Sequence, residues 1–226
     1  MFKVKQIAGK DVYYSDIIGA EHFFTSRELV VNDNLDIIKK YLGVEKLIKP
    51  TQTHSDNIKI VKEFETYDNT DALILKDKNN AIYLNFADCT PIVLYDEKKN
   101  IAAIAHAGWR GTAKQIGQKT LKKMIEYFDT EPKDVVAAIG PCIGFECFET
   151  YDEAIELLKS SVENTKSLFS GNFADLKGIN AEQLIELGVK RIDICPYCTV
   201  CDNDKFFSYR KENKTSLRHS AVIKAR

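Results

Sequence analysis

Short apolar runs bounded by polar or turn residues recur along the chain and predict β-strands. These runs are rich in valine, isoleucine and aromatic residues, as strands in protein cores are. Eight of them lie at residues 2–7, 58–64, 71–75, 81–86, 90–95, 101–106, 135–139 and 189–194. β-sheet is therefore expected to form a large part of the fold.

Four other segments carry apolar residues at the 3.6-residue spacing of an amphipathic helix. In the clearest one, Thr112 is a possible N-cap for a helix over 113–128, and Pro132 lies beyond its end. Because several strands follow one another between residues 58 and 106, we expect an α/β (α+β) fold with one or two mixed sheets and helices outside. The remaining helical patterns cover residues 33–42, 151–162 and 180–187.

The chain has the size and composition of one globular domain. It has 226 residues, of which 44% are hydrophobic, so it can bury a substantial core. No internal repeat, low-complexity tract or Gly/Ser-rich linker divides it. We therefore expect a single domain spanning residues 1–226, while the sequence gives no indication of an oligomeric state.

Charge and hydropathy argue against several classes of partner. The 32 lysine and arginine residues nearly balance the 33 aspartate and glutamate residues, so attraction to nucleic acid or to an anionic membrane is not expected. No apolar stretch approaches the roughly 20 residues of a membrane span, and the N-terminus lacks the apolar core of a signal peptide. Six cysteines in such a chain are more often thiols or metal ligands than disulfides. These features predict a cytoplasmic protein with a small-molecule substrate.

Two of the four histidines and one cysteine lie in polar or glycine-rich segments beside predicted strands, where functional sites are usually built. Two imidazoles and one thiolate, here His54, Cys89 and His106, form an accepted zinc set that leaves one position for water or substrate. Their separations of 35 and 17 residues form no local motif, so spacing leaves open whether they meet. The alternatives are hydrogen-bonded loop histidines and a buried cysteine, and structural roles are favoured for His22 and His219.

A glycine-rich turn, Gly108-Trp109-Arg110-Gly111-Thr112, joins a predicted strand to the helix at 113–128. Backbone N–H groups at the start of a helix can bind anions, and the guanidinium of Arg110 would add a forked donor for phosphate or carboxylate. Gly108, Arg110 and Gly111 are therefore candidates for an anion pocket, with an ordinary strand-to-helix turn as the alternative. A second glycine loop at residues 140–144 could form another wall.

Five polar or glycine-containing segments follow one another along the chain: Gln52-Thr53-His54, Asp71-Ala72-Leu73, Ala87-Asp88-Cys89-Thr90-Pro91, His106-Ala107-Gly108-Trp109-Arg110-Gly111 and Ile139-Gly140-Pro141. In this order they resemble the family variously called multicopper polyphenol oxidase (laccase-like), peptidoglycan editing factor and bacterial purine nucleoside phosphorylase. The resemblance extends over nearly the whole chain, from His22 to Arg210. It departs from the family pattern at Glu28-Leu29, where a glycine pair is common, and near residues 217–220, where only Arg218 is kept.

The resemblance implies Zn²⁺ bound by His54, Cys89 and His106 in a compact α/β sandwich of mixed sheets with helices packed outside. It also implies cleavage of adenosine, inosine and S-methyl-5'-thioadenosine with phosphate, with adenosine deaminase activity in addition. Arg27, in the matching N-terminal segment, joins the candidate substrate-binding residues. Asp88 is a candidate hydrogen-bond acceptor or proton carrier, with a capping role beside a turn as the alternative.

Other chemistries stay open at the level of sequence. Cys89 with a histidine base would suit a cysteine hydrolase or amidase acting on cell-wall precursors without a metal. Two histidines and a cysteine are also blue-copper ligands, so copper-dependent polyphenol oxidation is a less favoured alternative, and four histidines are too few for a multicopper cluster. For the run Cys195, Cys198 and Cys201, buried or idle thiols are favoured over a metal or redox site.

Overall fold

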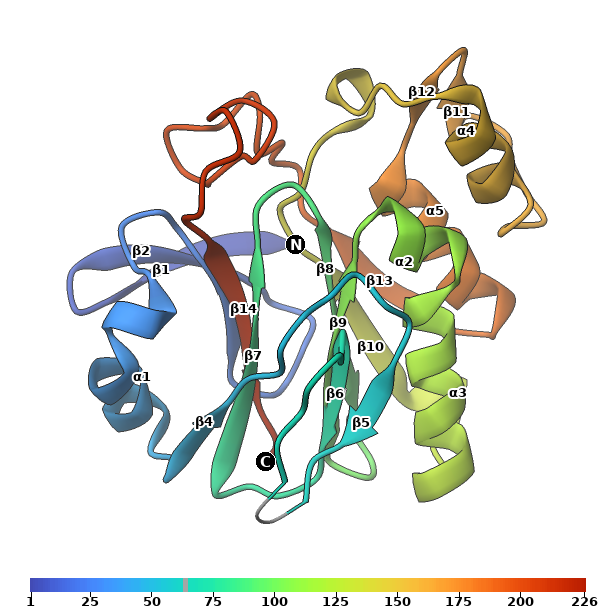
Figure 1. Ribbon diagram of the computed structural model, residues 1–226. Helices are drawn as coiled ribbons and strands as arrows, with labels where there is room; N and C mark the ends of the chain where they lie inside the picture. The colour runs from blue at the N-terminus through green and yellow to red at the C-terminus, as the bar shows by residue number, and fades with distance from the viewer. Residues whose placement is uncertain (63–64) are drawn as a thin grey trace.

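The computed structural model describes residues 1–62 and 65–226, and two six-stranded sheets form the centre of this part of the chain (Figure 1). The first sheet has the order β1 (Phe2–Ile7), β2 (Lys10–Ser15), β3 (His22–Thr25), β14 (His219–Lys224), β7 (Asn80–Phe86) and β4 (Lys46–Ile48). The second has the order β13 (Arg191–Ile194), β10 (Val135–Ile139), β8 (Thr90–Asp96), β9 (Ile101–Ala107), β6 (Ala72–Leu75) and β5 (Ile58–Ile60). Both sheets are mixed, because β4 runs parallel to β7 in the first, and β5 and β13 run parallel to β6 and β10 in the second.

The main core lies between the two sheets. Phe24 and Leu84 from the first sheet belong to the same buried cluster as Leu73 and Ile104 from the second. The second sheet is also covered on its other face, so β6, β8, β9 and β10 are buried along their whole length. Burial on both faces explains why these strands are continuous apolar runs instead of alternating patterns.

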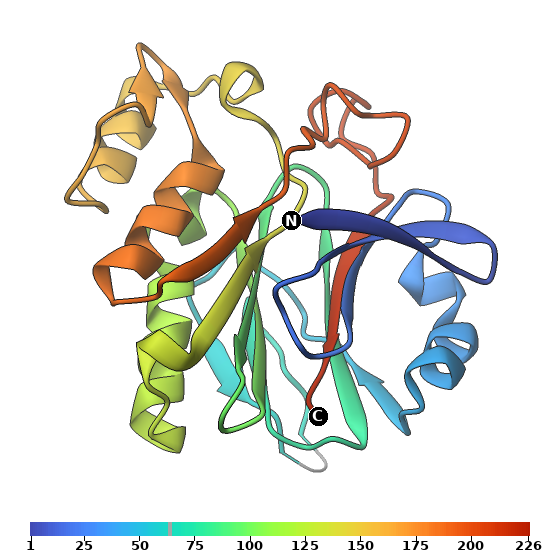
Figure 2. The same ribbon diagram turned by 180° about the vertical axis from the view of Figure 1, so that it is seen from behind.

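Helices cover the outer face of each sheet (Figures 1 and 2). Helix α1 (Leu35–Leu42) packs Ile38 against Tyr83 and Val222 of the first sheet. Helices α3 (Ile116–Phe128) and α5 (Leu176–Glu186) pack Leu121 and Leu184 against the second sheet. The predicted fold class, mixed sheets in a layered sandwich with helices outside, is therefore confirmed.

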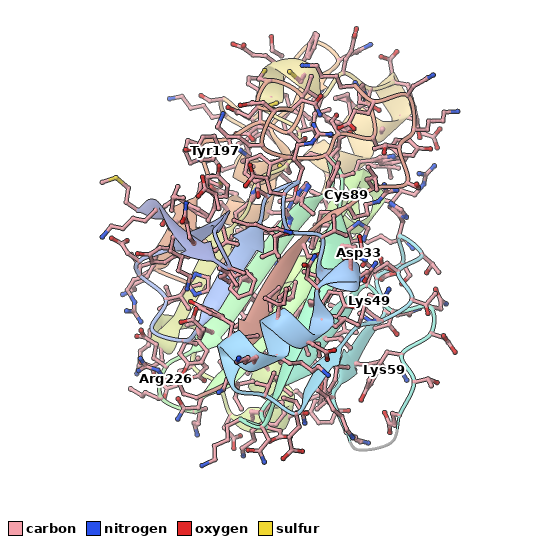
Figure 3. All side chains as sticks on the ribbon, turned by 90° about the vertical axis from the view of Figure 1, so that its left-hand side faces the viewer. Asp33, Lys49, Lys59, Cys89, Tyr197 and Arg226 are labelled. Carbon is pink, nitrogen blue, oxygen red and sulfur yellow. The ribbon has the colours of Figure 1, made fainter. Side chains whose placement is uncertain are left out.

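A smaller group of elements lies over one end of the second sheet. Its members share a buried apolar cluster with the start of α5, and in Figure 3 the yellow segment that contains α4 lies above Cys89. They are α2 (Trp109–Ala113), η3 (Phe145–Cys147), α4 (Asp152–Lys159), β11 (Phe169–Ser170) and β12 (Phe173–Ala174). Two further 3-10 turns are η1 (Val31–Asp33) and η2 (Pro132–Asp134).

The predicted elements are present, but several bounds differ. The helix expected over 113–128 begins at Ile116, because Gln115 adopts a left-handed conformation with φ of 60° and separates it from α2. Thr112 therefore lies inside α2 and does not cap the longer helix. The strand expected over 58–64 ends at Ile60, and its residues 63–64 lie outside the described part of the chain. Strands β2, β3, β4 and β14 were not predicted from the sequence.

No helix in the described residues has both the length and the apolar character needed to cross a membrane.

Candidate metal centre and active site

A cavity of about 620 Å³ opens where β8 begins and β9 ends. Its size is typical of small-molecule sites. Its walls come from the loops at residues 49–54, 85–89 and 106–109, and from more distant residues such as Phe148, Tyr209 and Arg218. His54, Cys89 and His106 all line it, so the structure brings the three candidate ligands to one place.

The antiparallel register of β8 and β9 explains why Cys89 and His106 meet. Thr90 pairs with Ala107 and Pro91 with His106, so the first residues of β8 lie beside the last residues of β9. Cys89 directly precedes Thr90 and therefore lies at the same edge as His106. A separation of 17 residues along the chain is thus closed by one hairpin.

Asp71, at the start of the neighbouring strand β6, holds both histidines. Its carboxylate accepts a hydrogen bond from His106 Nδ1 at 2.7 Å and is fully buried. The same carboxylate accepts the backbone N–H groups of Thr53, His54 and Ser55 at 2.7–3.1 Å, which fixes the loop that carries His54. Burial would raise the pKa of this carboxyl group, but the hydrogen bonds from His106 and Ser55 outweigh burial and hold the pKa well below its usual range.

The potential ligand atoms face one another across a short gap. His54 Nε2 lies 3.7 Å from Cys89 Sγ, and the ligand atoms of all three residues lie within 4.8 Å of one another. Gly108 makes this approach possible, since a Cβ atom there would lie 3.0 Å from Cys89 Sγ and 3.1 Å from His54 Cδ2. His54 has φ of 60°, a conformation that is uncommon for residues other than glycine and that the bonds to Asp71 support.

Charge is concentrated at the base of the cavity. Burial would raise the pKa of the Cys89 thiol, but His106 and His54 outweigh it and lower the pKa to about 6. Burial would likewise lower the pKa of His106, but Cys89 and Asp71 outweigh it and raise the pKa to about 9. With no ion bound, Cys89 and His106 therefore form a thiolate–imidazolium pair near neutral pH, and a bound cation would displace that proton.

Asp88 lies in the cavity wall, but its carboxylate is engaged in holding two loops. One oxygen accepts the hydroxyl of Thr199 at 2.6 Å, and the other accepts the backbone N–H of Arg210 at 2.7 Å. Asp71, and not Asp88, accepts the hydrogen bond from the candidate ligand His106. Asp71 was among the residues that carried the family resemblance, and the signal for it was an acid directly before a fully apolar strand.

The candidate anion-binding residues are spread over different places. Arg110 is exposed, stacks on the ring of its neighbour Trp109 at 4.3 Å, and is absent from the cavity lining. Arg27 is paired with Glu212, also away from the lining. Gly108 lines the cavity, whereas Gly111 packs against the backbone oxygen of His106.

Three other cationic side chains line the cavity and were not singled out from the sequence as anion ligands: Lys49, Arg210 and Arg218. Apolar walls are supplied by Trp109, Ile143, Phe148, Leu176 and Tyr209. The signal for Arg210 and Arg218 was their place in the family pattern near the C-terminus, while Lys49 had none beyond its charge. The cavity lining thus combines apolar and cationic side chains, with Arg210 beside Phe148 and Arg218 beside Tyr209.

The other two histidines lie outside the cavity lining. His22 is buried, with Nδ1 bonded to the backbone oxygen of Ala20 at 2.8 Å and Nε2 accepting the N–H of Ser15 at 3.1 Å. His219 packs against Phe86 and Phe206, and burial lowers its pKa to about 3. Both are structural, as expected.

Comparison with known proteins adds a family and several relatives. The family model described as multi-copper polyphenol oxidoreductase laccase matches residues 21–226. A purine nucleoside phosphorylase of Clostridium acetobutylicum is 33% identical over 194 residues, which cover 85% of this chain and 82% of that protein. Adenosine deaminase RL5, from an unknown prokaryotic organism, is 34% identical over 190 residues, which cover 75% of this chain and 72% of that protein.

The fold is shared with a solved structure. The crystal structure of YlmD from Geobacillus stearothermophilus superposes with a TM-score of 0.88 at 25% identity, covering 99% of this chain and 98% of that chain. The arrangement of sheets and helices described above is therefore that of a known structural group.

Proposed function

The chain belongs to the multi-copper polyphenol oxidoreductase laccase family, and from that membership we propose that it is an enzyme, a zinc-dependent purine nucleoside phosphorylase. It cleaves adenosine, inosine and S-methyl-5'-thioadenosine with phosphate to give the free base and the sugar 1-phosphate. The observation that carries the proposal is one cavity with three potential metal ligands at its base and three cationic side chains in its wall. The name of the Clostridium acetobutylicum relative, purine nucleoside phosphorylase, supports it. Residues 1–226 act as one domain in this proposal.

The donor set fits zinc. Tetrahedral zinc with Zn–N and Zn–S bonds of about 2.0–2.3 Å holds its nitrogen and sulfur ligands about 3.6 Å apart, close to the 3.7 Å between His54 Nε2 and Cys89 Sγ. A blue-copper site usually adds a weak methionine ligand. The two methionines of the chain lie elsewhere, Met1 exposed at the N-terminus and Met124 buried between α3, to which it belongs, and the second sheet. The donor chemistry therefore favours zinc over copper.

Phosphorolysis needs a phosphate held against the anomeric carbon while positive charge develops on the sugar. Lys49, Arg210 and Arg218 are suited to bind and orient the phosphate, because they are the cations of the cavity wall. The apolar residues of the wall, among them Phe148 and Tyr209, are suited to hold the purine and to exclude water. When bound, the ion supplies a positive charge that can polarise a substrate oxygen or nitrogen.

Asp71 has a positioning role in this scheme. Its carboxylate holds the proton of His106 at Nδ1, which leaves Nε2 of the same ring free to act as a ligand. It also fixes the loop of His54 through three backbone N–H groups. The metal ligands are thus oriented before substrate arrives.

Deamination of adenosine is a second activity that we propose for the same cavity. The 34% identity to an adenosine deaminase supports it. A metal site with a vacant position is the usual means of activating water for attack on a purine ring. The two reactions are distinguished by their products, since phosphorolysis releases adenine and deamination releases inosine.

The test is a product analysis with metal-free and zinc-loaded protein. Each of the three nucleosides is incubated with and without phosphate, and the products are separated by chromatography. The proposal expects free base and sugar 1-phosphate only when zinc and phosphate are both present. Base release without phosphate dependence, or full activity after removal of the metal, would contradict it.

A cysteine-hydrolase mechanism is the alternative, and the short contact between Cys89 and His54 supports it. The same assay distinguishes this mechanism from the zinc mechanism. A thiol mechanism predicts inactivation by alkylation of Cys89 and no effect of a chelator. The zinc mechanism predicts loss of activity with the chelator and recovery when zinc is restored. Reloading with copper in place of zinc, followed by a polyphenol oxidation assay, examines the remaining alternative.

A further inference from the structure

A second cluster of cysteines lies outside the cavity lining. Cys147 ends η3, and Cys198 and Cys201 lie in the loop that follows β13. The sulfur atoms of the three residues lie within 4.8 Å of one another, and Cys147 Sγ is 3.6 Å from Cys201 Sγ. Cys195, from the same run in the sequence, is buried separately and does not belong to the cluster.

The backbone around Cys198 is arranged to stabilise a negatively charged sulfur. Its Sγ accepts the N–H of Gly144 at 3.1 Å, and the N–H groups of Val200 and Cys201 also donate to it. The turn itself is closed by the side chain of Asp202, which accepts the N–H of Cys198 at 2.9 Å. A Cys-x-x-Cys turn whose first sulfur accepts backbone N–H groups is the arrangement that supports metal-bound thiolates.

The spacing of the sulfurs suits one metal ion. Zn–S bonds of about 2.3 Å in a tetrahedral site place sulfurs about 3.8 Å apart, whereas a disulfide requires about 2.05 Å. The 3.6 Å between Cys147 and Cys201 matches the metal geometry. Cys201 is exposed and the other two are partly exposed, so an ion can enter from solvent.

We propose that Cys147, Cys198 and Cys201 bind a second zinc ion, independent of the one proposed at His54, Cys89 and His106. Within residues 1–62 and 65–226, these three thiols are joined by no fourth histidine, cysteine or acidic ligand at the same range, so water completes the tetrahedron. The ion would link two segments, residues 144–147 and 198–201, that belong to different parts of the chain.

Two short connections join the proposed site to the cavity. Thr199, between the two loop cysteines, donates its hydroxyl to Asp88. Arg210, a cavity residue, donates its guanidinium N–H groups to the backbone oxygens of Cys147 and Glu149 at 3.0 and 3.1 Å. The proposed site therefore adjoins the cavity wall, where these hydrogen bonds themselves hold Asp88 and Arg210.

The experiment counts zinc per chain in the full-length protein. Each variant is loaded with zinc under a thiol reductant, freed of unbound ion by gel filtration, and analysed by mass spectrometry of the metal. The expected values are about two for the wild type, about one for Cys201→Ser, about one for Cys89→Ala and none for the double variant. Cys195→Ala, which removes a cysteine outside both groups, is the control and keeps about two.

A Cys201→Ser protein that retains as much zinc as the wild type would overturn the second site. Wild-type protein with one zinc that is lost in Cys201→Ser and kept in Cys89→Ala would support it and would instead count against the proposed active-site metal. If Cys201→Ser does not fold, cobalt-loaded Cys89→Ala decides the question, since only the cysteine cluster can then give intense sulfur-to-cobalt absorption. Absence of that absorption would overturn the proposal.

Discussion

Two groups of potential ligands lie close together in this molecule, and they are supported in opposite ways. In the first group, the carboxylate of Asp71 holds His106, near the end of the buried strand β9, and the loop of His54, while Cys89 directly precedes the buried strand β8. The cysteine cluster lies on loops and is supported by backbone N–H groups directed at sulfur. The first group faces a cavity with a vacant side, while the second links two chain segments.

The surroundings of the two groups indicate different roles. The first group suits a metal that takes part in a reaction, and the second suits a metal that joins two chain segments. A catalytic metal needs ligands fixed in advance and an open position that faces the substrate cavity, whereas a metal that links two chain segments needs only ligands from both of them. A cysteine thiolate can therefore bind a catalytic or a segment-linking metal, depending on the residues that surround it. Removing a residue from each group should affect different properties, and four substitutions test this, beginning with the largest expected effect.

Cys89→Ala is expected to abolish bound metal at the cavity and to lower kcat/KM for phosphorolysis by at least ~10³-fold. The reason is that a metal contributes several kcal/mol of transition-state stabilisation, at about 1.36 kcal/mol for each factor of ten. Steady-state kinetics with inosine and metal analysis measure the two losses. Cys195→Ala is the matched control. Equal losses of metal and of kcat/KM in both variants would contradict the assignment of Cys89 as a metal ligand.

Asp71→Asn is expected to weaken zinc affinity or activity by roughly 10–100-fold, as the loss of a hydrogen-bonded partner of a metal-bound histidine usually does. The amide no longer carries the charge that His106 and the loop N–H groups share. Competition with a fluorescent chelator measures the affinity. Asp68→Asn alters an exposed acid nearby and should change little, and unchanged affinity in Asp71→Asn would show that the carboxylate does not position the ligands.

Arg218→Gln is expected to raise the KM for phosphate about tenfold with a smaller effect on kcat. A hydrogen bond to a charged group contributes about 1.5–3 kcal/mol. Arg110→Gln provides the comparison, since Arg110 is exposed and absent from the cavity lining while Arg218 belongs to it. A larger rise in the KM for phosphate for Arg110→Gln than for Arg218→Gln would show that phosphate binds at the glycine-rich turn and not at Arg218.

Cys201→Ser is expected to leave kcat within about threefold while lowering thermal stability. An ion present at 100 times its Kd stabilises the folded state by about 2.7 kcal/mol, which corresponds to a fall in Tm of ~5–10 °C for a chain of this size. Differential scanning calorimetry with zinc present measures the change. A loss of activity as large as that of Cys89→Ala, with unchanged Tm, would reverse the roles assigned to the two groups.

The parts of the fold that could be predicted are those whose signal is local. The strands at 101–107 and 135–139 are buried on both faces and apolar throughout except for His106, and they were predicted nearly to the residue. Strand β14 was missed, since it follows a long polar loop and its burial depends on β3 and β7, which are far away in the sequence. The left-handed Gln115 that interrupts the helix leaves no trace in residue type.

The candidate site likewise has features that the sequence could predict and features that depend on the fold. The residue types of His54, Cys89 and His106 indicated a metal, but their meeting depends on the pairing of β8 with β9 and on a carboxylate from β6. Cys147 could not be grouped with Cys198 and Cys201 by spacing, because about fifty residues intervene. Lys49, Arg210 and Arg218 became cavity residues only through the loops that carry them.

The hairpin of β8 and β9 has a practical use. The ligands Cys89 and His106 lie at its open end, while the turn at residues 97–100 is at the other end, about 23 Å away for seven extended residues. Residues 97–100 are exposed, so extra length there would extend into solvent without changing the pairing of Thr90 with Ala107. A dye, an affinity tag or a surface tether could therefore be inserted at this turn to follow the working protein.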